Sequence, residues 1–302
     1  MEIMTVLGPI APEQMGITQT HEHLLVDFYE FVRDYGAILD DEDVAVEELG
    51  YFKRAGGRGI VDVSMIDVGR NPLGLQRVAR ASGLHVIMST GWYREASYPP
   101  YIQTMTADQL AEIMVRDLVE GADGTGVRAG LIGEIGTERG HITPAQERVF
   151  RSAARAQKQT GRAITTHCTR GELALEQLAL LREEGVDPGR IIIGHMGDRR
   201  HTQVEQAVLR AGAYVQIDHI GFAHMQPDLQ RARNIAELVR VGFADRILLS
   251  LDICLTSHLH RYGGRGYNHL LTSFVPLMKG AGIADEHIQA MLVDNPRRAL
   301  AY

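Results

Sequence analysis

The chain has 302 residues, of which 45% are hydrophobic and 23% charged, and this composition describes a globular protein and excludes the disordered and fibrous classes. Its formal net charge of -7, without a stripe of Lys or Arg interleaved with aromatics, argues against nucleic acid as a partner, and no apolar run approaches the ~18 residues of a membrane span. Because two cysteines are too few for a disulfide framework and the first residues lack signal-peptide features, we expect a cytoplasmic protein that contacts no membrane.

Short runs rich in β-branched residues alternate with amphipathic helical stretches along the chain. Gly8, Pro9 and Pro12 predict a short hairpin or strap before the first long strand. Strands are then expected over residues 17–23, 59–64, 84–90, 129–134, 163–167, 191–195, 213–218 and 247–252. Helices are expected over residues 44–54, 73–81, 107–120, 144–159, 172–184, 204–210 and 229–241. A helical tail over roughly 268–301, with breaks near Gly280 and Pro296, closes the chain.

This alternation predicts one α/β domain over residues 1–302, folded as a closed (β/α)8 TIM barrel of eight parallel strands. In such a barrel the active site lies at the C-terminal ends of the strands. A doubly wound open sheet is the competing fold, but it would spread the strand ends along a line and could not easily bring their side chains together.

Metal-type side chains occur at the ends of five of these strands. His21 and His23 are two residues apart, so on a strand they point to the same face and can reach one metal ion. Such a pair arises by chance often enough that it would prove little alone. Four later strand-like runs, however, also end in possible ligands, which are Glu134, His167, His195 and Asp252. The recurrence therefore predicts a metal centre.

Four histidines and two carboxylates suit Zn, Mn, Co or Fe better than Ca or Mg, which prefer shells of oxygen alone. Six ligands are too many for one catalytic ion that keeps a position open for water, so we expect two divalent ions. Two such ions would lie ~3.5–4 Å apart and share a bridging hydroxide, because together they lower the pKa of water toward neutrality. Glu134 is the natural candidate for a carboxylate that holds the pair from the other side.

Five short motifs surround the proposed ligands, in order over essentially the whole chain. They are Thr20-His-Glu-His, Gly133-Glu, Thr166-His, Gly194-His and Leu251-Asp. In this order and spacing they resemble the phosphotriesterase family of the amidohydrolase superfamily. The resemblance implies that His21, His23 and Asp252 hold the more buried ion. By the same resemblance His167 and His195 hold the more exposed one, with zinc the favoured metal and a homodimer the usual assembly.

The chain departs from many family members at the bridging position. Those members use a lysine carboxylated by CO2, whereas this chain has Glu134 at the matching strand end, as some relatives do. A glutamate supplies a carboxylate without modification, so we predict that metal loading does not depend on bicarbonate.

The resemblance also implies a proton relay. Asp252 would accept a proton during attack and pass it to His219, after the seventh strand, and then to Asp198, just after the ligand of the sixth strand. An alternative is that His219 and its neighbour Asp218 form a purely structural pair.

The loop after the third strand contains two candidate substrate-binding residues. Tyr93 matches a tyrosine that leans over the metals toward the substrate in lactonase-like relatives. Arg94 suggests that the protein holds an anionic group such as a carboxylate. The alternative is a loop aromatic that packs on the barrel rim beside a solvent-facing arginine.

The segment over residues 254–267 is long and rich in glycine, so we expect it to shape the substrate pocket or to act as a lid. Six further histidines fit no ligand spacing and are expected at the surface or in the core. They are His85, His141, His201, His224, His269 and His287.

The leading functional hypothesis is a metal-dependent hydrolase that uses a metal-bridging hydroxide on a small-molecule lactone or carboxylic ester. The alternatives are an amidohydrolase acting on small N-acyl compounds, a promiscuous phosphotriesterase, and a metal-containing binding protein without turnover. Fold and metal ligands alone do not decide among these substrates.

Overall fold

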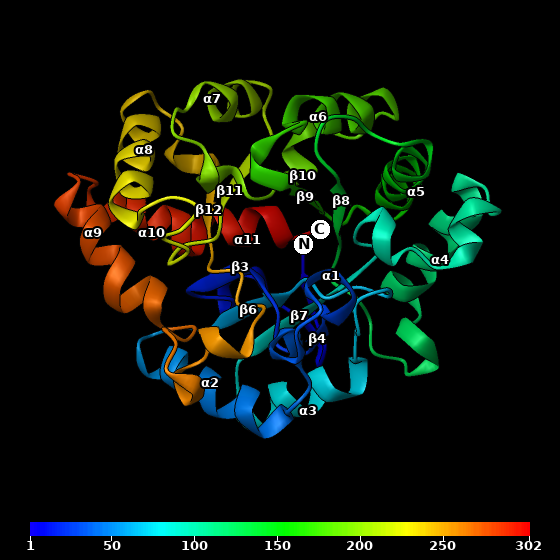
Figure 1. Ribbon diagram of the computed structural model, residues 1–302, viewed down its shortest axis with the longest axis horizontal. Helices are drawn as coiled ribbons and strands as arrows, with labels where there is room; N and C mark the ends of the chain where they lie inside the picture. The colour runs from blue at the N-terminus through cyan, green and yellow to red at the C-terminus, as the bar shows by residue number, and fades with distance from the viewer.

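Eight parallel strands form a nearly closed barrel in the computed structural model, which describes residues 1–302 (Figure 1). The barrel strands are β3 (Thr18–Glu22), β6 (Gly59–Asp62), β7 (His85–Thr90), β8 (Leu131–Thr137), β9 (Ile164–Cys168), β10 (Ile191–Ile193), β11 (Tyr214–Ile217) and β12 (Ile247–Leu249). Each strand pairs in parallel with the next barrel strand along the chain, and β3 and β12 stand at the two ends of this order. The predicted barrel is therefore confirmed.

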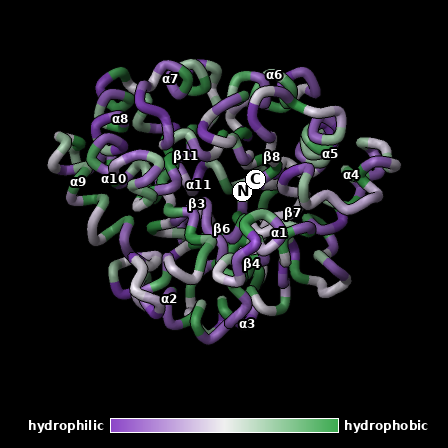
Figure 2. The backbone as a smooth tube through the Cα atoms, viewed as in Figure 1, coloured by the Kyte–Doolittle hydropathy of each residue, from purple (hydrophilic) through white to green (hydrophobic).

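Helices surround the strands and connect them. They are α2 (Glu42–Arg54), α3 (Pro72–Ser82), α4 (Ala107–Val119), α5 (Pro144–Thr160), α6 (Ala174–Glu183), α7 (Gln203–Arg210) and α8 (Asp228–Arg240). Capping side chains define several of their starts: the Asp41 carboxylate accepts the amides of Asp43 and Val44, and Thr143 forms a capping box with Gln146. Figure 2 shows hydrophobic and hydrophilic residues alternating along these helices, as expected where one face packs on the barrel.

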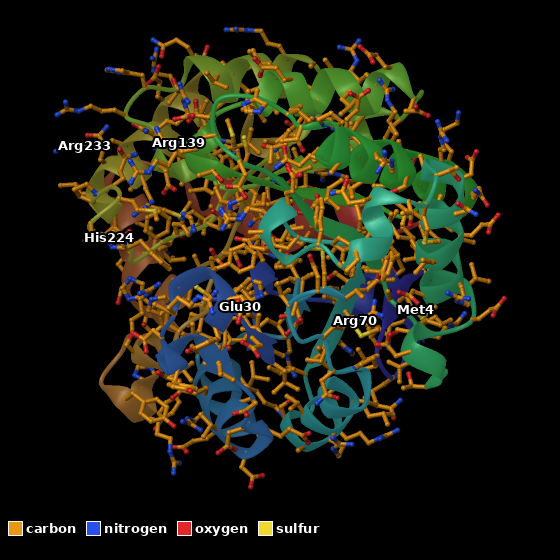
Figure 3. All side chains as sticks on the ribbon, turned by 45° about the vertical axis from the view of Figure 1, so that its right-hand side comes forward. Met4, Glu30, Arg70, Arg139, His224 and Arg233 are labelled. Carbon is orange, nitrogen blue, oxygen red and sulfur yellow. The ribbon has the colours of Figure 1, made fainter.

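The two ends of the chain meet. β1 (Ile3–Thr5) and β2 (Gly8–Ile10) form the expected antiparallel hairpin. The Glu2 amide donates to the Tyr302 carbonyl at 3.2 Å, and the Tyr302 amide donates back at 3.1 Å. Figure 3 shows Met4 of β1 and His224 on opposite sides of the barrel. The terminal segments therefore lie away from the face on which His224 is found.

Shorter elements complete the fold. They are β4 (Val26–Asp27), α1 (Tyr29–Val32), β5 (Ile38–Leu39), α9 (Val275–Gly280), α10 (Asp285–Gln289) and α11 (Asn295–Leu300). The tail breaks after Gly280, as expected, but the predicted break at Pro296 is wrong. Pro296 lies in the first turn of α11, directly after a π-helical turn over residues 290–294. A proline is tolerated in a first turn, where its missing amide costs little.

Three of the strands predicted to end in a ligand have ends that are shifted by two or three residues. β8 continues three residues past Glu134, so this side chain lies within the strand rather than at its end. β10 and β12 instead end before His195 and Asp252, which have φ values of +56° and +55°. This left-handed backbone conformation cannot continue a strand.

Candidate metal centre

The six proposed ligands lie together, and the Glu134 carboxylate is in their midst. Its Oε2 atom lies 3.1 Å from His167 Nδ1 and 3.3 Å from both His21 Nε2 and His195 Nε2. Its Oε1 atom lies 3.5 Å from His23 Nε2. One carboxylate therefore reaches all four histidines.

Asp252, which follows the last barrel strand, β12, lies beside the same cluster. Its Oδ1 atom lies 3.2 Å from His23 Nε2 and 3.8 Å from His21 Nε2. Two groups consist only of proposed ligands, and within each group the ligand atoms lie no more than 4.8 Å apart. They are His21, His23 and Asp252, and Glu134, His167 and His195. The strand positions thus bring together nitrogen and oxygen donors that are far apart in the sequence.

Unpaired polar atoms support a divalent metal at this cluster. His21 Nε2 and Asp252 Oδ1 are buried and have no hydrogen-bond partner. Buried polar groups without partners are costly, and a cation bound among nitrogen and carboxylate donors would satisfy both atoms. The mixed donor set suits borderline transition ions rather than Ca or Mg.

Neighbouring polar groups fix the orientation of the histidine rings. His195 Nδ1 lies 2.8 Å from Asp218 Oδ1, and His23 Nδ1 lies 3.0 Å from Ser64 Oγ. Each contact leaves Nε2 to face the cluster, which is how outer partners usually orient a metal-binding imidazole. His167 differs, because its Nε2 lies 2.9 Å from Thr169 Oγ1 and its Nδ1 faces inward.

Charge pairing dominates the electrostatics of the cluster. Burial alone would raise the pKa of Glu134, but the histidines around it hold that pKa well below its usual range. Burial likewise opposes protonation of His23, yet the neighbouring carboxylates of Asp252 and Glu134 raise its pKa to about 10. Burial and the neighbouring His195 lower the pKa of His167 to about 3. Glu134 is therefore ionised and is available as a ligand.

The structure also assembles the residues of the expected relay. His219 Nε2 lies 2.7 Å from Asp252 Oδ2, and its Nδ1 lies 2.8 Å from Asp198 Oδ2. Arg231 donates to the other Asp198 oxygen at 3.1 Å. Asp218 contacts His195 instead of His219, an arrangement that sequence reasoning missed because Asp218 was weighed only against its chain neighbour.

A cavity of about 390 Å³ opens above the cluster. Phe28, Phe31 and Phe222 contribute apolar walls. The Tyr93 hydroxyl lies 3.2 Å from His167 Nδ1, and burial raises the pKa of this phenol well above its usual range. Tyr93 therefore stays protonated and can donate a hydrogen bond inside the cavity.

Arg94 lines the same cavity beside Tyr93. Its guanidinium carbon lies 4.8 Å from the centre of the Phe31 ring and 4.9 Å from that of Tyr93. Nη1 lies 3.4 Å from Glu138, whereas Nε is buried without a partner. A Cβ at Gly136 would come within 2.7 Å of the Arg94 stem, so this glycine makes room for the arginine.

The segment over residues 254–267 contributes to the cavity only in part. Cys254, Leu255 and His258 line the cavity. The ring of His260 instead packs on that of Tyr51 of α2, with 4.6 Å between their centres. The expectation that the segment shapes the pocket therefore fits its first residues best.

His224 also lines the cavity, unlike the other five histidines that fit no ligand spacing. It is exposed, and it lies on the side of the barrel opposite Met4 (Figure 3). It belongs to a loop without periodicity, so no sequence signal places it at the site.

None of the helices combines enough length with enough apolar residues to cross a bilayer.

Comparison with known proteins agrees with this geometry. The sequence profile described as the Phosphotriesterase family matches residues 1–300. A phosphotriesterase homology protein from Escherichia coli is 38% identical over 281 residues, which cover 93% of this chain and 96% of that protein. An N-acetyltaurine hydrolase from Danio rerio is 31% identical, with coverage of 100% of this chain and 98% of that protein.

Among solved structures, a lactonase from Listeria monocytogenes superposes with a TM-score of 0.95 at 28% sequence identity. The superposition covers 100% of this chain and 99% of the lactonase. The predicted resemblance is confirmed, and with it the expectation of a metal-dependent hydrolase. The chain belongs to the phosphotriesterase family.

Proposed function

We propose that the protein is a binuclear metal-dependent hydrolase in which Glu134 bridges two divalent ions. His21, His23 and Asp252 would hold one ion, and His167 and His195 would hold the other. The observation that carries this proposal is the Glu134 carboxylate, which lies within 3.5 Å of a nitrogen of each of the four histidines. Zinc is the favoured metal, with Mn, Co or Fe as alternatives.

When bound, the ions supply an activated water as nucleophile and polarise the bond under attack. The chain's own residues then handle the proton. Asp252 accepts it, and His219, 2.7 Å away, carries it onward or delivers it to the leaving group. Asp198 holds the other nitrogen of His219 and thereby keeps the imidazole in place.

We propose a lactone or a carboxylic ester as the substrate. The protonated Tyr93 hydroxyl, beside His167, is placed to donate to a carbonyl oxygen of the substrate. Apolar walls of phenylalanine suit an uncharged acyl chain. The lactonase from Listeria monocytogenes, which matches this chain along its full length, supports the same choice.

A small N-acyl compound with an anionic group is the second candidate substrate. The observation that favours it is Arg94, whose buried Nε has no partner and whose guanidinium lines the cavity. A guanidinium edge of this kind can bind a carboxylate or sulfonate. The N-acetyltaurine hydrolases among the relatives support this alternative.

The test combines metal analysis with a substrate panel. Protein purified without chelator is expected to contain about two transition ions per chain, and reconstitution of the chelated protein should not require bicarbonate. A lactone, an aryl ester, an N-acyl amino acid and an aryl phosphotriester are then compared by kcat/KM.

Activity that disappears on chelation, with the lactone or ester turned over fastest, supports the proposal. A higher kcat/KM for the N-acyl compound selects the second candidate. Protein that binds no Zn, Mn or Co overturns the metal centre. Metal-loaded protein that binds these compounds but hydrolyses none shows a binding protein instead.

A further inference from the structure

The barrel closes where the first and last of its strands meet. β3 and β12 stand at the ends of the sheet order, and backbone hydrogen bonds join residues 252 and 253, just past β12, to residues 21 and 23. The Asp252 amide donates to the His21 carbonyl at 3.3 Å, and the His23 amide donates to the Ile253 carbonyl at 3.2 Å. Two long backbone hydrogen bonds therefore join the two segments that carry three of the proposed ligands.

The Glu22 side chain reinforces this closure. It is fully buried, and its Oε1 atom accepts hydrogen bonds from the Ser250 hydroxyl and the Leu251 amide, both at 2.7 Å. Its Oε2 atom accepts from the Ile253 amide at 2.8 Å. The two amides flank Asp252, so one carboxylate holds the chain on both sides of that residue.

This arrangement fixes an uncommon backbone conformation. Asp252 has a φ of +55°, which residues other than glycine rarely adopt and which persists only when the surroundings impose it. Ser250 extends the same network, because its hydroxyl oxygen also accepts the His21 amide at 3.0 Å. The hydrogen bonds of Glu22 and Ser250 thus connect the backbone around Asp252 to the segment that carries His21 and His23.

The other ligand group is carried by strands that lie away from this closure. Glu134 and His167 lie on β8 and β9, which pair with each other in the sheet, and His195 follows β10, which pairs with β9. Only the group of His21, His23 and Asp252 spans the junction of β3 and β12. A change at Glu22 should therefore affect the two ligand groups unequally.

We propose that Glu22 is a positioning residue that sets the metal position formed by His21, His23 and Asp252 by clamping the two amides beside Asp252. This inference rests on the proposed binuclear function. A carboxylate is required because it only accepts hydrogen bonds, whereas a glutamine of the same shape would turn an NH2 group toward a donor. The Glu22→Gln variant therefore changes hydrogen bonding with little change in packing.

The experiment measures metal binding in the full chain. Wild type, Glu22→Gln and a control, Glu205→Gln, are stripped with chelator, titrated with zinc and analysed for bound metal. Glu205 is also a buried carboxylate but belongs to α7, so the control repeats the chemical change away from the centre. We expect two binding steps in wild type and control, and ~10–100-fold weaker binding of one ion alone in Glu22→Gln. With excess zinc, kcat should recover while KM stays close to that of wild type.

Two results would overturn the proposal. Glu22→Gln could bind both ions as wild type does and lose only thermal stability, which would make Glu22 a structural residue. The variant could also weaken both ions equally, which would contradict the separation of the two groups. If Glu22→Gln does not fold, Ser250→Ala removes one partner of the clamp and must show the same selective weakening. Wild type that binds no zinc at all would instead contradict the proposed function, before any variant is compared.

Discussion

At the residue scale, the role of each histidine follows from what its second ring nitrogen contacts. His195 and His23 direct Nε2 to the cluster because Asp218 and Ser64 occupy their Nδ1 positions. His219 has a carboxylate within 2.8 Å of each nitrogen, so neither nitrogen faces the cluster freely, and this is why we propose it for proton transfer and not as a ligand. Identical side chains thus acquire different chemistry from their neighbours.

The Asp198→Asn variant tests the relay. Burial and His195 lower the pKa of His219, but Asp198 and Asp252 outweigh them and raise it to about 9. Removing the Asp198 charge therefore lowers the His219 pKa, by about 1–3 units for a neighbouring charge. Because the protonated imidazole is the form that protonates a leaving group, the basic limb of the pH profile of kcat should move to lower pH. The profile is measured with an amide substrate.

Asp228→Asn is the matched control, since Asp228 also binds Arg231 but is not a partner of His219. Its pH profile should keep the wild-type basic limb. An unchanged limb in Asp198→Asn, or an equal shift in both variants, would contradict the relay.

The sequence predicted candidate metal ligands more readily than the residues that hold those ligands in position. His21, His23 and Asp252 could be proposed as ligands because side chains that can bind a metal recur at strand ends, and the structure brings these three together. Glu22 and Asp218 each adjoin a histidine in sequence, and their partners, Leu251 and His195, are distant in the chain. Only the folded barrel shows these contacts.

At the element scale, the loop after β7 carries Tyr93 and Arg94, the two cavity-lining residues that we propose contact the substrate. The Asp67 carboxylate accepts the Tyr93 amide at 2.9 Å and the Ser97 hydroxyl at 2.5 Å, and so ties this loop to the one after β6. Gly136 of β8 leaves the space into which the Arg94 stem packs. The loop is therefore held from two neighbouring strands, which suits a specificity element.

The Arg94→Ala variant tests which substrate this loop recognises. If Arg94 binds an anionic group, kcat/KM for an N-acyl amino acid should fall by about 10–100-fold, since a charged hydrogen bond contributes about 1.5–3 kcal/mol. An uncharged lactone should be hydrolysed as by wild type. Arg139→Ala, which removes an exposed arginine paired with Glu172, provides the control. Equal losses for both substrates would show that Arg94 only supports the loop.

Element boundaries were harder to predict than element types. The alternation of strands and helices was sufficient to predict the barrel, but not that β10 and β12 stop short of their ligands. The residues that turn the chain are His195 and Asp252 themselves, with positive φ values. Neither residue type signals such a turn as glycine does, so the sequence pattern extended both strands too far.

At the scale of the whole molecule, the ligands join segments from all around the barrel. They come from β3 and the residue after it, from β8 and β9, and from the loops after β10 and β12. Bound ions would thus cross-link the first strand to the last across the closure as well as to the middle of the sheet. The folded barrel presents these ligands together, whereas the unfolded chain does not.

Chelation should therefore lower thermal stability as well as activity. Ions at 100 times their Kd stabilise the folded state by about 2.7 kcal/mol per site, and the entropy of unfolding of a 302-residue chain implies a shift of roughly 1.5–2 °C per kcal/mol, or ~8–10 °C for two sites. We expect the midpoint of thermal unfolding, followed by circular dichroism, to fall by at least ~5 °C when chelator is added. Zinc should restore it, whereas Mg should not, because Mg prefers oxygen ligands. A midpoint that chelator leaves unchanged would mean that the six residues bind no ion in the folded protein.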